Sequence, residues 1–497
     1  MPFQFQLDGQ QVEVDDDGSS LLEVLRDRLG VRSPKDGCSP QGQCGCCTVL
    51  VDGAPRVACV TPARRIAGRQ VTTLDGLPPE TRQQWADAFC ATGASQCGFC
   101  TPGIIVRLTA GGDLLAHLCR CTGWRTILEA AARVGETFPE RDLDAASARA
   151  AIEGGVPQRV APEVALGAGG FADDTAPDDA LFAVPDGRGG WAVGETLAEA
   201  RAKAGKVQGR RTTIDVRHPL DLPPGDWDVA LRTTWVEPAY LEPDASWCVP
   251  GGEPYTPLAN GGAFGGKADS PAPAAARALA DELGKPVRVL LSREDVVRLG
   301  PKRPPVAGGA NADGTGVLRV ARTPGIAAAI ASVAPGLRVE EADVVGPPTS
   351  AHVRAAGWAE AAVLVAAAAK RLEVTAPNGA RAEAVVTDEG VRVRVACGDP
   401  LDDVVLRSYC IGAAHMALGW VRTEGIAVDE QGEVHDLTIR SFGILRAKDT
   451  PPIEVEIDRT PGPSVNGSDA VFAAVSAAAW RADGLGPDWP LSRRRTT

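Results

Sequence analysis

The residues best able to do chemistry are cysteines, and they gather near one end of the chain. Ten of the thirteen cysteines fall within the first 121 of 497 residues. A disulfide scaffold is not expected in a long chain without a secretion signal, because cytosolic thiols are kept reduced. Cysteine this concentrated in a reducing compartment indicates ligation of a metal ion or a metal cluster.

The first group of four thiols lies in a glycine-rich loop and the hairpin after it, and comprises Cys38, Cys44, Cys47 and Cys59. Its spacing differs by one residue from the C-x4-C-x2-C spacing of plant-type [2Fe–2S] centres, which also use a distant fourth cysteine. Glycines in the loop permit positive φ values, so backbone N–H groups can point toward a negatively charged cluster. Cys46 is then a spare thiol, expected to face the interior as a small apolar residue.

The second group comprises Cys97, Cys100, Cys119 and Cys121. A C-x2-C pair and a C-x-C pair again supply four thiolates, here at helix ends. Structural zinc is the alternative for both groups, but zinc sites usually use paired C-x2-C knuckles, so clusters are favoured. His117 is expected to be a core or surface histidine rather than a ligand, because eight cysteines already fill two clusters.

Two kinds of sequence pattern predict the hairpins and helices that position these thiols. Residues 3–14 and 48–60 alternate around Asp-Gly pairs, which predicts two hairpins. A helix capped by Ser19 and Ser20 is predicted between them. From about residue 80 the hydrophobic period becomes helical, which predicts helices within 81–93, 101–112 and 123–135.

The patterns divide the chain into four parts. We expect a small α+β domain over 1–79, a helical domain over 80–135, a polar linker over 136–163 and a mixed region over 164–497. Within the last part, strands are predicted at 391–397 and 453–457, and helices at 274–283 and 469–480.

The overall charge limits the choice of partners. The chain has 51 basic and 64 acidic residues, a net charge of −13, which argues against nucleic acid as a partner. No run of eighteen apolar residues suggests a membrane span, and the N-terminus lacks the pattern of a secretion signal. A cytoplasmic protein without a membrane partner is therefore expected.

Three stretches, GCSPQGQCGCCTVLVDG, SQCGFCTPG and HLCRCTGWR, resemble the iron–sulfur region of the xanthine oxidase and aldehyde oxidase family, the molybdenum hydroxylases. The resemblance covers about the first 135 residues, and one departure is the five residues between Cys38 and Cys44, where the family usually has four. It implies an α+β multidomain chain: a β-grasp plant-type ferredoxin domain, a four-helix [2Fe–2S] domain and a shortened molybdopterin-binding-like region. It also implies that the second cluster lies nearer the molybdenum cofactor and that Gln96 lies against the pterin.

The stretch NGGAFGGKA, residues 260–268, is nearly a P-loop, but Ala268 replaces the Ser or Thr that would bind Mg²⁺ and no apolar strand precedes it. It resembles the family's GGxFGGK loop, whose backbone amides approach the cofactor's oxo ligand. By that resemblance Gly262, Phe264 and Gly265 are candidate cofactor-binding residues; a plain glycine-rich turn is the alternative. Arg354, in VRAAGWAEA, resembles the arginine of another family segment.

The catalytic base expected of the family is missing. The closing stretch PSVNGSDAVFAAVSAAAW resembles the family's final segment, where a glutamate follows glycine and deprotonates a metal-bound hydroxyl. Here Gly467 is followed by Ser468 and Asp469. Serine is no general base without a partner, and Asp469 can equally cap the next helix. These two residues are therefore weak candidates, and the catalytic residue is not assigned.

Two principal hypotheses follow from the resemblance. In the first, a molybdenum site hydroxylates an aldehyde or N-heterocycle, and electrons pass through two [2Fe–2S] clusters to a separate FAD subunit, since no flavin domain interrupts the chain. In the second, the chain is an electron-transfer and scaffold subunit that binds no molybdenum, and a complete molybdopterin-binding subunit is a further partner. An oligomer is expected in either case, and a structural zinc protein is the third alternative.

Overall fold

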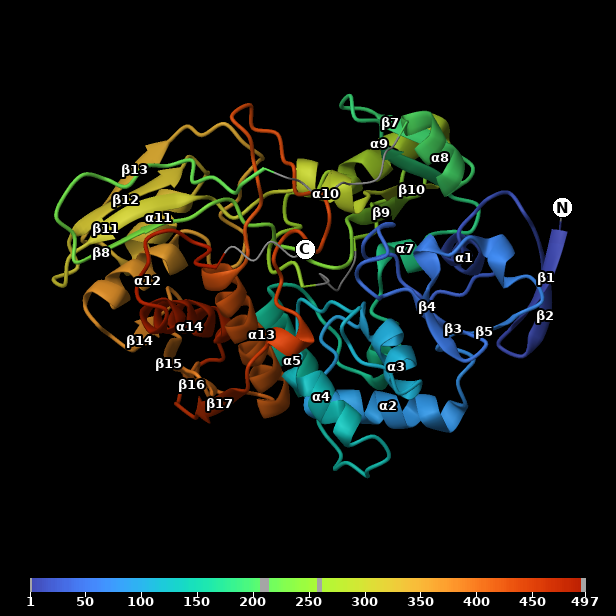
Figure 1. Ribbon diagram of the computed structural model, residues 1–497, viewed down its shortest axis with the longest axis horizontal. Coiled ribbons are helices and arrows are strands. Elements are labelled where there is room, and N and C mark those ends of the chain that lie inside the picture. Colours follow the sequence, from blue (N-terminus) through green and yellow to red (C-terminus); the bar gives the residue numbers. More distant parts are fainter. Residues whose placement is uncertain (1, 206–213, 257–261, 493–497) are drawn as a thin grey trace.

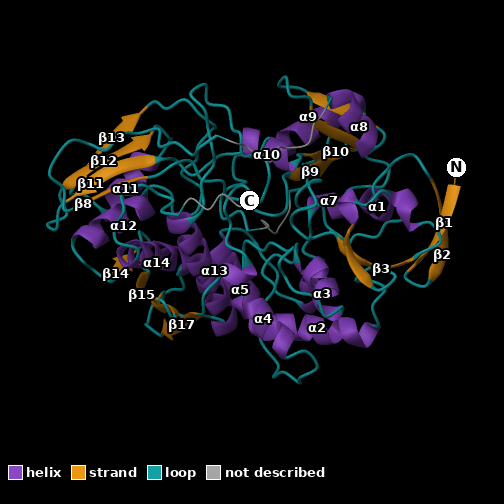
Figure 2. Ribbon diagram, viewed as in Figure 1, coloured by secondary structure: helices purple, strands orange, loops and turns teal. Residues whose placement is uncertain are grey.

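The computed structural model of the protein describes residues 2–205, 214–256 and 262–492. Within these residues four sheets form, with helices between and beside them (Figure 1, Figure 2). The N-terminal sheet lies at one end of the molecule and the sheet formed within residues 229–342 lies toward the other, with helix α13 (Asp403–Arg422) between them (Figure 1). The multidomain α+β class expected from the sequence is confirmed.

The first sheet has the strand order β2-β1-β5-β3-β4. Both predicted hairpins are present, because β1 pairs with β2 and β3 pairs with β4 in antiparallel register. Ser20 caps the helical segment α1 (Leu21–Glu23), and its side chain and that of Glu23 form a capping box. The strands of this sheet are β1 (Pro2–Leu7), β2 (Gln10–Asp15), β3 (Thr48–Val51), β4 (Ala54–Val57) and β5 (Gln70–Thr72).

The three helices predicted from the change of period are confirmed. They are α2 (Pro79–Thr92), α3 (Thr101–Thr109) and α4 (Arg125–Ala132). Gly93, at φ +70°, ends α2 in the left-handed conformation that glycine adopts without strain. The cysteines of the second group lie in the loops that enter α3 and α4.

The range 136–163 contains a buried helix, α5 (Leu143–Gly154). Its small and polar residues suggest an exposed connection when read along the sequence. In the structure Ala146 and Ala150 are fully buried, and the helix packs on α13. Small side chains allow this close helix contact, so a composition typical of linkers here belongs to an element of the core.

Three further sheets form within the remaining described residues, with strand orders β7-β6-β10-β9, β13-β12-β11-β8 and β14-β15-β16-β17. Their strands are β6 (Leu181–Pro185), β7 (Trp191–Gly194), β8 (Val229–Arg232), β9 (Ala245–Cys248), β10 (Val287–Leu290), β11 (Val306–Ala310), β12 (Gly316–Ala321), β13 (Leu337–Ala342), β14 (Glu373–Thr375), β15 (Arg381–Thr387), β16 (Gly390–Ala396) and β17 (Ile453–Asp458). The helices are α6 (Pro162–Ala165), α7 (Ala172–Thr175), α8 (Leu197–Ala204), α9 (Ala272–Leu283), α10 (Arg293–Leu299), α11 (Ile326–Val333), α12 (Trp358–Ala368), α13 and α14 (Ser468–Ala482).

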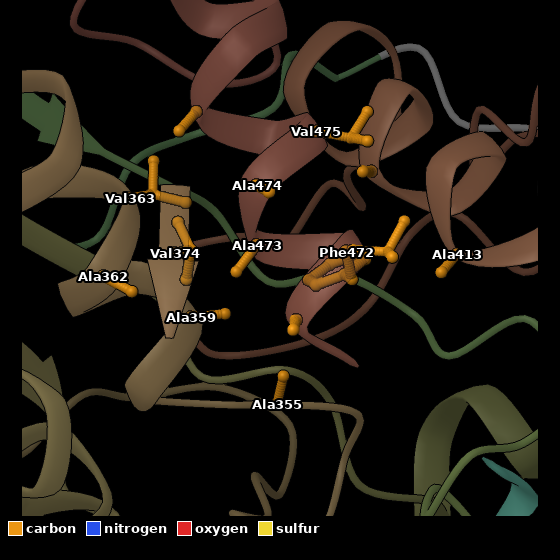
Figure 3. Packing of buried hydrophobic residues seen from close by; sticks show 14 of the residues in the cluster. Ala355, Ala359, Ala362, Val363, Val374, Ala413, Phe472, Ala473, Ala474 and Val475 are labelled. Carbon is orange, nitrogen blue, oxygen red and sulfur yellow. The ribbon is translucent and has the colours of Figure 1, made fainter. Parts of the chain in front are cut away.

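The strands and helices predicted in this region are confirmed by β16, β17, α9 and α14. Alternate residues of β16 are buried, as expected for a sheet covered on one face. The largest core lies where α12, α13 and α14 pack on the fourth sheet. Figure 3 shows part of this core, in which many of the labelled side chains, such as Ala359, Ala413 and Ala474, are small and let the helices approach closely. Phe472 on α14 also stacks on Trp420, with ring centroids 5.1 Å apart.

Helix α13 has the length and apolar composition of a membrane-spanning helix, yet 89% of its most apolar window is buried inside the protein. It packs along α14 and α5. Its apolar surface is thus covered by the rest of the chain, as in the central helix of a folded domain.

The N-terminal core continues into a distant segment of the chain. Residues 426–444 contribute several buried apolar side chains to the same cluster as the first cysteine loop. Gln41 Nε2 donates to the carbonyl oxygen of Leu437 at 2.8 Å, and Arg440 Nε donates to that of Gln43 at 2.9 Å. Gln41 and Gln43 belong to the five-residue stretch between Cys38 and Cys44. Residues 426–444 therefore contact the part of the loop whose spacing differs from that of the family it resembles.

An ion pair between Arg149 and Glu153 on α5 joins this helix to α14. Both side chains are fully buried. The Glu153 carboxylate accepts hydrogen bonds from the backbone N–H groups of Gly467 and Ser468 at 3.0 and 2.9 Å. A negative charge at a helix N-terminus is stabilised by the free N–H groups there.

Substitution Glu153→Gln should lower the free energy of unfolding by about 3–5 kcal/mol, because it leaves the buried Arg149 guanidinium without a countercharge. Urea unfolding followed by tryptophan fluorescence measures the change. The matched control is Glu199→Gln, which removes an exposed i,i+4 partner of Lys203 and should leave the midpoint unchanged. Equal shifts in the two variants would contradict the role assigned to the buried pair.

Candidate metal centres and the adjoining glycine loop

The four thiols of the first predicted group lie together and are almost fully buried. The Cys38 sulfur is within hydrogen-bonding reach of the Cys44 and Cys59 sulfurs, and the Cys59 sulfur also reaches that of Cys47. Each of these side chains is at most 5% exposed. The structure therefore gathers four residues that span 22 positions of the sequence into one group of neighbouring sulfur atoms.

The loop backbone points two N–H groups toward the sulfur of Cys38 in this group. The amides of Gln41 and Gln43 donate to the Cys38 sulfur at 3.3 and 3.4 Å. Gly42, between them, has φ +69°, in the left-handed region that favours glycine. Amides aimed at sulfur stabilise thiolates and the negative charge of a bound cluster.

Cys46, the spare thiol, is fully buried beside the first group of thiols. Its sulfur lies close to that of Cys44, and burial raises the pKa of the Cys46 thiol. A side chain at Gly37 would place its Cβ 3.1 Å from the Cys46 sulfur, so the surroundings are tightly filled. These features fit an apolar packing role, and the choice of Cys47 rather than Cys46 as ligand stays a prediction.

The four thiols of the second group also lie together. The sulfurs of Cys97 and Cys121 are 3.6 Å apart, and the Cys119 sulfur reaches those of Cys100 and Cys121. The hydroxyl of Thr122 lies 3.1 Å from the Cys119 sulfur. Cys100 occupies the N-cap position just before α3, and its side chain makes no capping hydrogen bond.

The two thiol groups are in direct backbone contact. Leu118, next to a ligand of the second group, donates its N–H to the carbonyl oxygen of Cys44 at 3.0 Å. A Cβ at Gly103 on α3 would stand 2.3 Å from the carbonyl oxygen of Gly45, and one at Gly45 would stand 2.4 Å from Nδ1 of His117. Only glycine allows the loops to approach this closely, which places the two centres side by side.

His117 belongs to the core of this contact. It is 1% exposed, and burial lowers its pKa to about 4, so the imidazole is neutral near pH 7. It packs on Gly45 instead of joining the thiols, in line with the expectation of a core or surface histidine.

The electrostatics of the thiols favour a bound cationic centre. Hydrogen bonds from neighbouring thiols lower the pKa of Cys38 and of Cys119, whereas contact with neighbouring thiols and burial raise those of Cys44, Cys100 and Cys121. Several buried thiolates cannot coexist without a compensating positive charge. The iron ions of two bound clusters would supply that charge, and thiolates are the ligands such clusters take.

The number of thiols in each group suits a two-iron cluster. A [2Fe–2S] centre takes two thiolates on each iron, and each group supplies four cysteines.

The predicted cofactor-binding residues of the C-terminal region also come together. The Arg354 guanidinium lies 4.1 Å from the ring centroid of Phe264, and the Arg354 backbone N–H donates to the Phe264 carbonyl oxygen at 2.9 Å. Phe264 has φ +43°, an unusual value for a residue with a side chain. A Cβ at Gly265 would stand 1.8 Å from the carbonyl oxygen of His352, so this loop packs directly on the segment of Arg354. Asn260 and Gly261 lie outside the described residues.

The two weak catalytic candidates meet the same arginine. Arg354 Nε donates to Oδ1 of Asp469 at 2.8 Å, and its Nη2 donates to the Ser468 hydroxyl. Asp469 thus forms an ion pair with Arg354. The backbone N–H of Asp469 donates to Oδ1 of Asn466 at 3.0 Å. The charge that a general base would use is already engaged in an ion pair.

The glycine loop adjoins the second thiol group. A Cβ at Gly262 would stand 3.1 Å from the Cys121 sulfur. Gln96 donates through Nε2 to the carbonyl oxygen of Cys121 and to the Ser408 hydroxyl, both at 3.0 Å, while its Oε1 is buried without a partner among the described residues. These contacts place the glycine loop and Gln96 beside the second thiol group; that this group lies nearer a molybdenum cofactor stays a prediction.

Sequence reasoning did not single out Arg120, which lies between two predicted ligands, or its partner Glu424. Their buried ion pair links the second thiol group to the end of α13. The signal was present in Cys119-Arg120-Cys121, since a charged residue between two ligands must be compensated. Glu424 lies 304 residues further along the chain, so no local pattern identifies it.

Comparison with known proteins supports this arrangement. Two family models match: a 2Fe-2S iron-sulfur cluster binding domain over residues 5–73 and a [2Fe-2S] binding domain over residues 73–132. A nicotinate dehydrogenase subunit of Pseudomonas putida is 39% identical over 150 residues, which cover 27% of this chain and 93% of that protein. The xanthine dehydrogenase iron-sulfur-binding subunit of Escherichia coli O157:H7 is 38% identical over 127 residues, covering 22% of this chain and 79% of that protein.

The longer relatives extend the comparison to the whole fold. The aldehyde oxidoreductase of Megalodesulfovibrio gigas is 39% identical over 150 residues, which cover 26% of this chain and only 16% of that protein. The solved structure of the aldehyde oxidoreductase from Desulfovibrio gigas superposes with a TM-score of 0.70 at 14% identity, covering 96% of this chain and 97% of that chain. The fold is therefore shared beyond the iron–sulfur part.

The chain belongs to the xanthine dehydrogenase and aldehyde oxidoreductase family, to whose iron–sulfur subunits its N-terminal part is homologous. An electron-transfer role follows from the two [2Fe–2S] binding domains.

The substitutions Cys46→Ser and Cys47→Ser test the ligand assignment at adjacent buried positions. We expect Cys46→Ser to retain about four irons per chain and Cys47→Ser to lose the first cluster, leaving about two. Iron analysis and the electron paramagnetic resonance spectrum of the reduced protein measure both. Loss of a cluster in Cys46→Ser, with an intact spectrum in Cys47→Ser, would reverse the assignment.

Proposed function

We propose that this chain is an electron-transfer subunit of a molybdenum-hydroxylase-type oxidoreductase, carrying electrons through two [2Fe–2S] clusters. The observation that carries the proposal is the backbone contact between the two buried thiol groups, from Leu118 N–H to the carbonyl oxygen of Cys44. Clusters held this close exchange electrons without a mobile carrier. The ligands would be Cys38, Cys44, Cys47 and Cys59 for the first cluster, and Cys97, Cys100, Cys119 and Cys121 for the second.

The C-terminal region is proposed to act as a scaffold that holds no molybdenum. Three features support this role: Ser468 stands where the family has its catalytic carboxylate, Asp469 is paired with Arg354, and Arg354 lies on Phe264. The residues that would receive a molybdopterin cofactor instead bind one another. They do not fit the chemistry of the family's hydroxylation step, and no such step is assigned to them.

The partners follow from this assignment. A scaffold without its own molybdenum requires a separate molybdopterin-binding subunit, where a small aldehyde or N-heterocycle would be oxidised. The FAD subunit would accept the electrons, and the complex would be an oligomer in the cytoplasm, where free thiols persist. The proposed parts are the ferredoxin domain over 1–79, the helical cluster domain over 80–135, the connection over 136–163 and the scaffold over 164–497.

A second candidate function is hydroxylation within this chain. It is favoured by the contact of the glycine loop with the second thiol group, where Gly262 approaches the Cys121 sulfur, and by the position of Gln96. This candidate requires a molybdenum cofactor bound between the glycine loop and Arg354, and thus a rearrangement of the Arg354–Asp469 pair.

Metal analysis of the complex isolated with its native partners separates these functions. We expect about four irons per chain and, after this chain is separated from its partners, a molybdenum content near zero. Molybdenum near one atom per separated chain would establish the second candidate instead. Zinc in place of iron, with no visible absorption from clusters, would refute both.

A further inference from the structure

We propose that Glu424 is a positioning residue that sets the reduction potential of the second cluster through Arg120. The inference rests on the proposed function, because it requires a cluster on Cys97, Cys100, Cys119 and Cys121. It concerns a residue that touches neither the cluster ligands nor a substrate, and it assigns a redox role to the C-terminal region.

The pair has the geometry of a strong charge-assisted contact. Arg120 donates through Nη1 and Nη2 to the two carboxylate oxygens of Glu424 at 2.6 and 2.8 Å, and through Nε to the carbonyl oxygen of Pro238 at 2.9 Å. The two side chains are 3% and 1% exposed. Two parallel hydrogen bonds fix a guanidinium against a carboxylate with little freedom.

The fold builds a place for the Glu424 carboxylate at the end of α13. A Cβ at Gly419 would stand 2.1 Å from Oε1 of Glu424, and one at Gly443 would stand 3.1 Å from the Glu424 Cα. The Glu424 N–H also donates to the carbonyl oxygen of Gly419 at 2.7 Å. The missing side chain of Gly419 therefore leaves the space that the carboxylate fills.

Other charges near Arg120 are already compensated. Arg303, Arg354 and Glu237 line the same small cavity as the pair. Their partners are Glu360 at 2.7 Å, Asp469 at 2.8 Å and Lys302 at 2.9 Å, respectively. Glu424 is the residue whose two carboxylate oxygens compensate the Arg120 guanidinium.

The charge of Arg120 affects the reduction potential of the second cluster. Arg120 stands between two ligands in the sequence, and a Cβ at Gly262 would lie 3.0 Å from the Arg120 Cβ and 3.1 Å from the Cys121 sulfur. Reduction adds one negative charge to a [2Fe–2S] centre, and a nearby positive charge favours that step. The Glu424 carboxylate offsets this effect and holds the potential lower. Because the pair is buried, solvent and salt screen these charges only weakly.

The alternative is that the pair only holds the Cys119–Cys121 turn in shape. The two roles differ in what a change of charge does. A purely structural pair affects cluster loading and stability, and it gives no reason for the potential to move in one direction. A charge role predicts a rise in potential when the carboxylate is made neutral, and no shift when the charge is kept.

The test is a redox titration of the reconstituted full-length protein, with both clusters followed by electron paramagnetic resonance. For Glu424→Gln we expect the ratio of reduced to oxidised second cluster at a fixed ambient potential to rise about tenfold, which is 59 mV for a one-electron couple. Glu424→Asp, which keeps the charge, and the double variant Arg120→Gln/Glu424→Gln, which removes both charges, should each stay within about twofold of the wild type.

Glu340→Gln is the matched control, since it removes the partner of Arg319 in the sheet of β12 and β13 and should not move either potential. If the Glu424→Gln variant does not bind the second cluster, the Gly419→Ala variant is used in its place. The added methyl group displaces the Glu424 carboxylate, and the reduction potential of the second cluster should rise. An unchanged or lowered potential in a loaded variant overturns the inference, as does loss of the second cluster in both variants. A wild-type protein that forms no second cluster refutes the proposed function instead.

Discussion

The structure depends on the burial of eight thiols in two touching groups. Sulfur atoms this close in a water-excluded core repel one another once ionised, and as neutral thiols they form only weak hydrogen bonds. The surroundings make sense only with positive charge at the centre of each group. Loop amides aimed at sulfur and the glycines between the two loops both serve that arrangement.

The C-terminal half shares the fold of a solved aldehyde oxidoreductase, and its candidate cofactor-binding residues contact one another. The glycine loop, Arg354 and the start of α14 meet at one place. Their contacts are now with one another: cation on aromatic ring, guanidinium on carboxylate and hydroxyl. Such contacts stabilise a packed interface, and they pair the Asp469 carboxylate with Arg354, so that it is not free for proton abstraction.

The sequence predicted most clearly what is local. The hairpins, the three helices before residue 135 and the two thiol groups follow from spacing within short windows, where Asp-Gly turns and cysteine intervals carry the information. Helix α5 was not foreseen, because alanine and small polar residues fit a linker as well as a helix packed on α13. The Arg120–Glu424 pair could not be foreseen either, since only the folded chain brings the two residues together.

The segment 426–444, which completes the N-terminal core and holds Gln41 and Gln43, has a consequence for assembly. In relatives such as the iron–sulfur-binding protein of Escherichia coli, the corresponding part is a polypeptide of its own. Here the core of the iron–sulfur part includes apolar side chains of residues 426–444. The iron–sulfur part therefore cannot separate from the C-terminal region without exposing its own core. Because both parts belong to one polypeptide, each C-terminal region carries one iron–sulfur part. The ratio of the two parts is therefore one to one at any protein concentration.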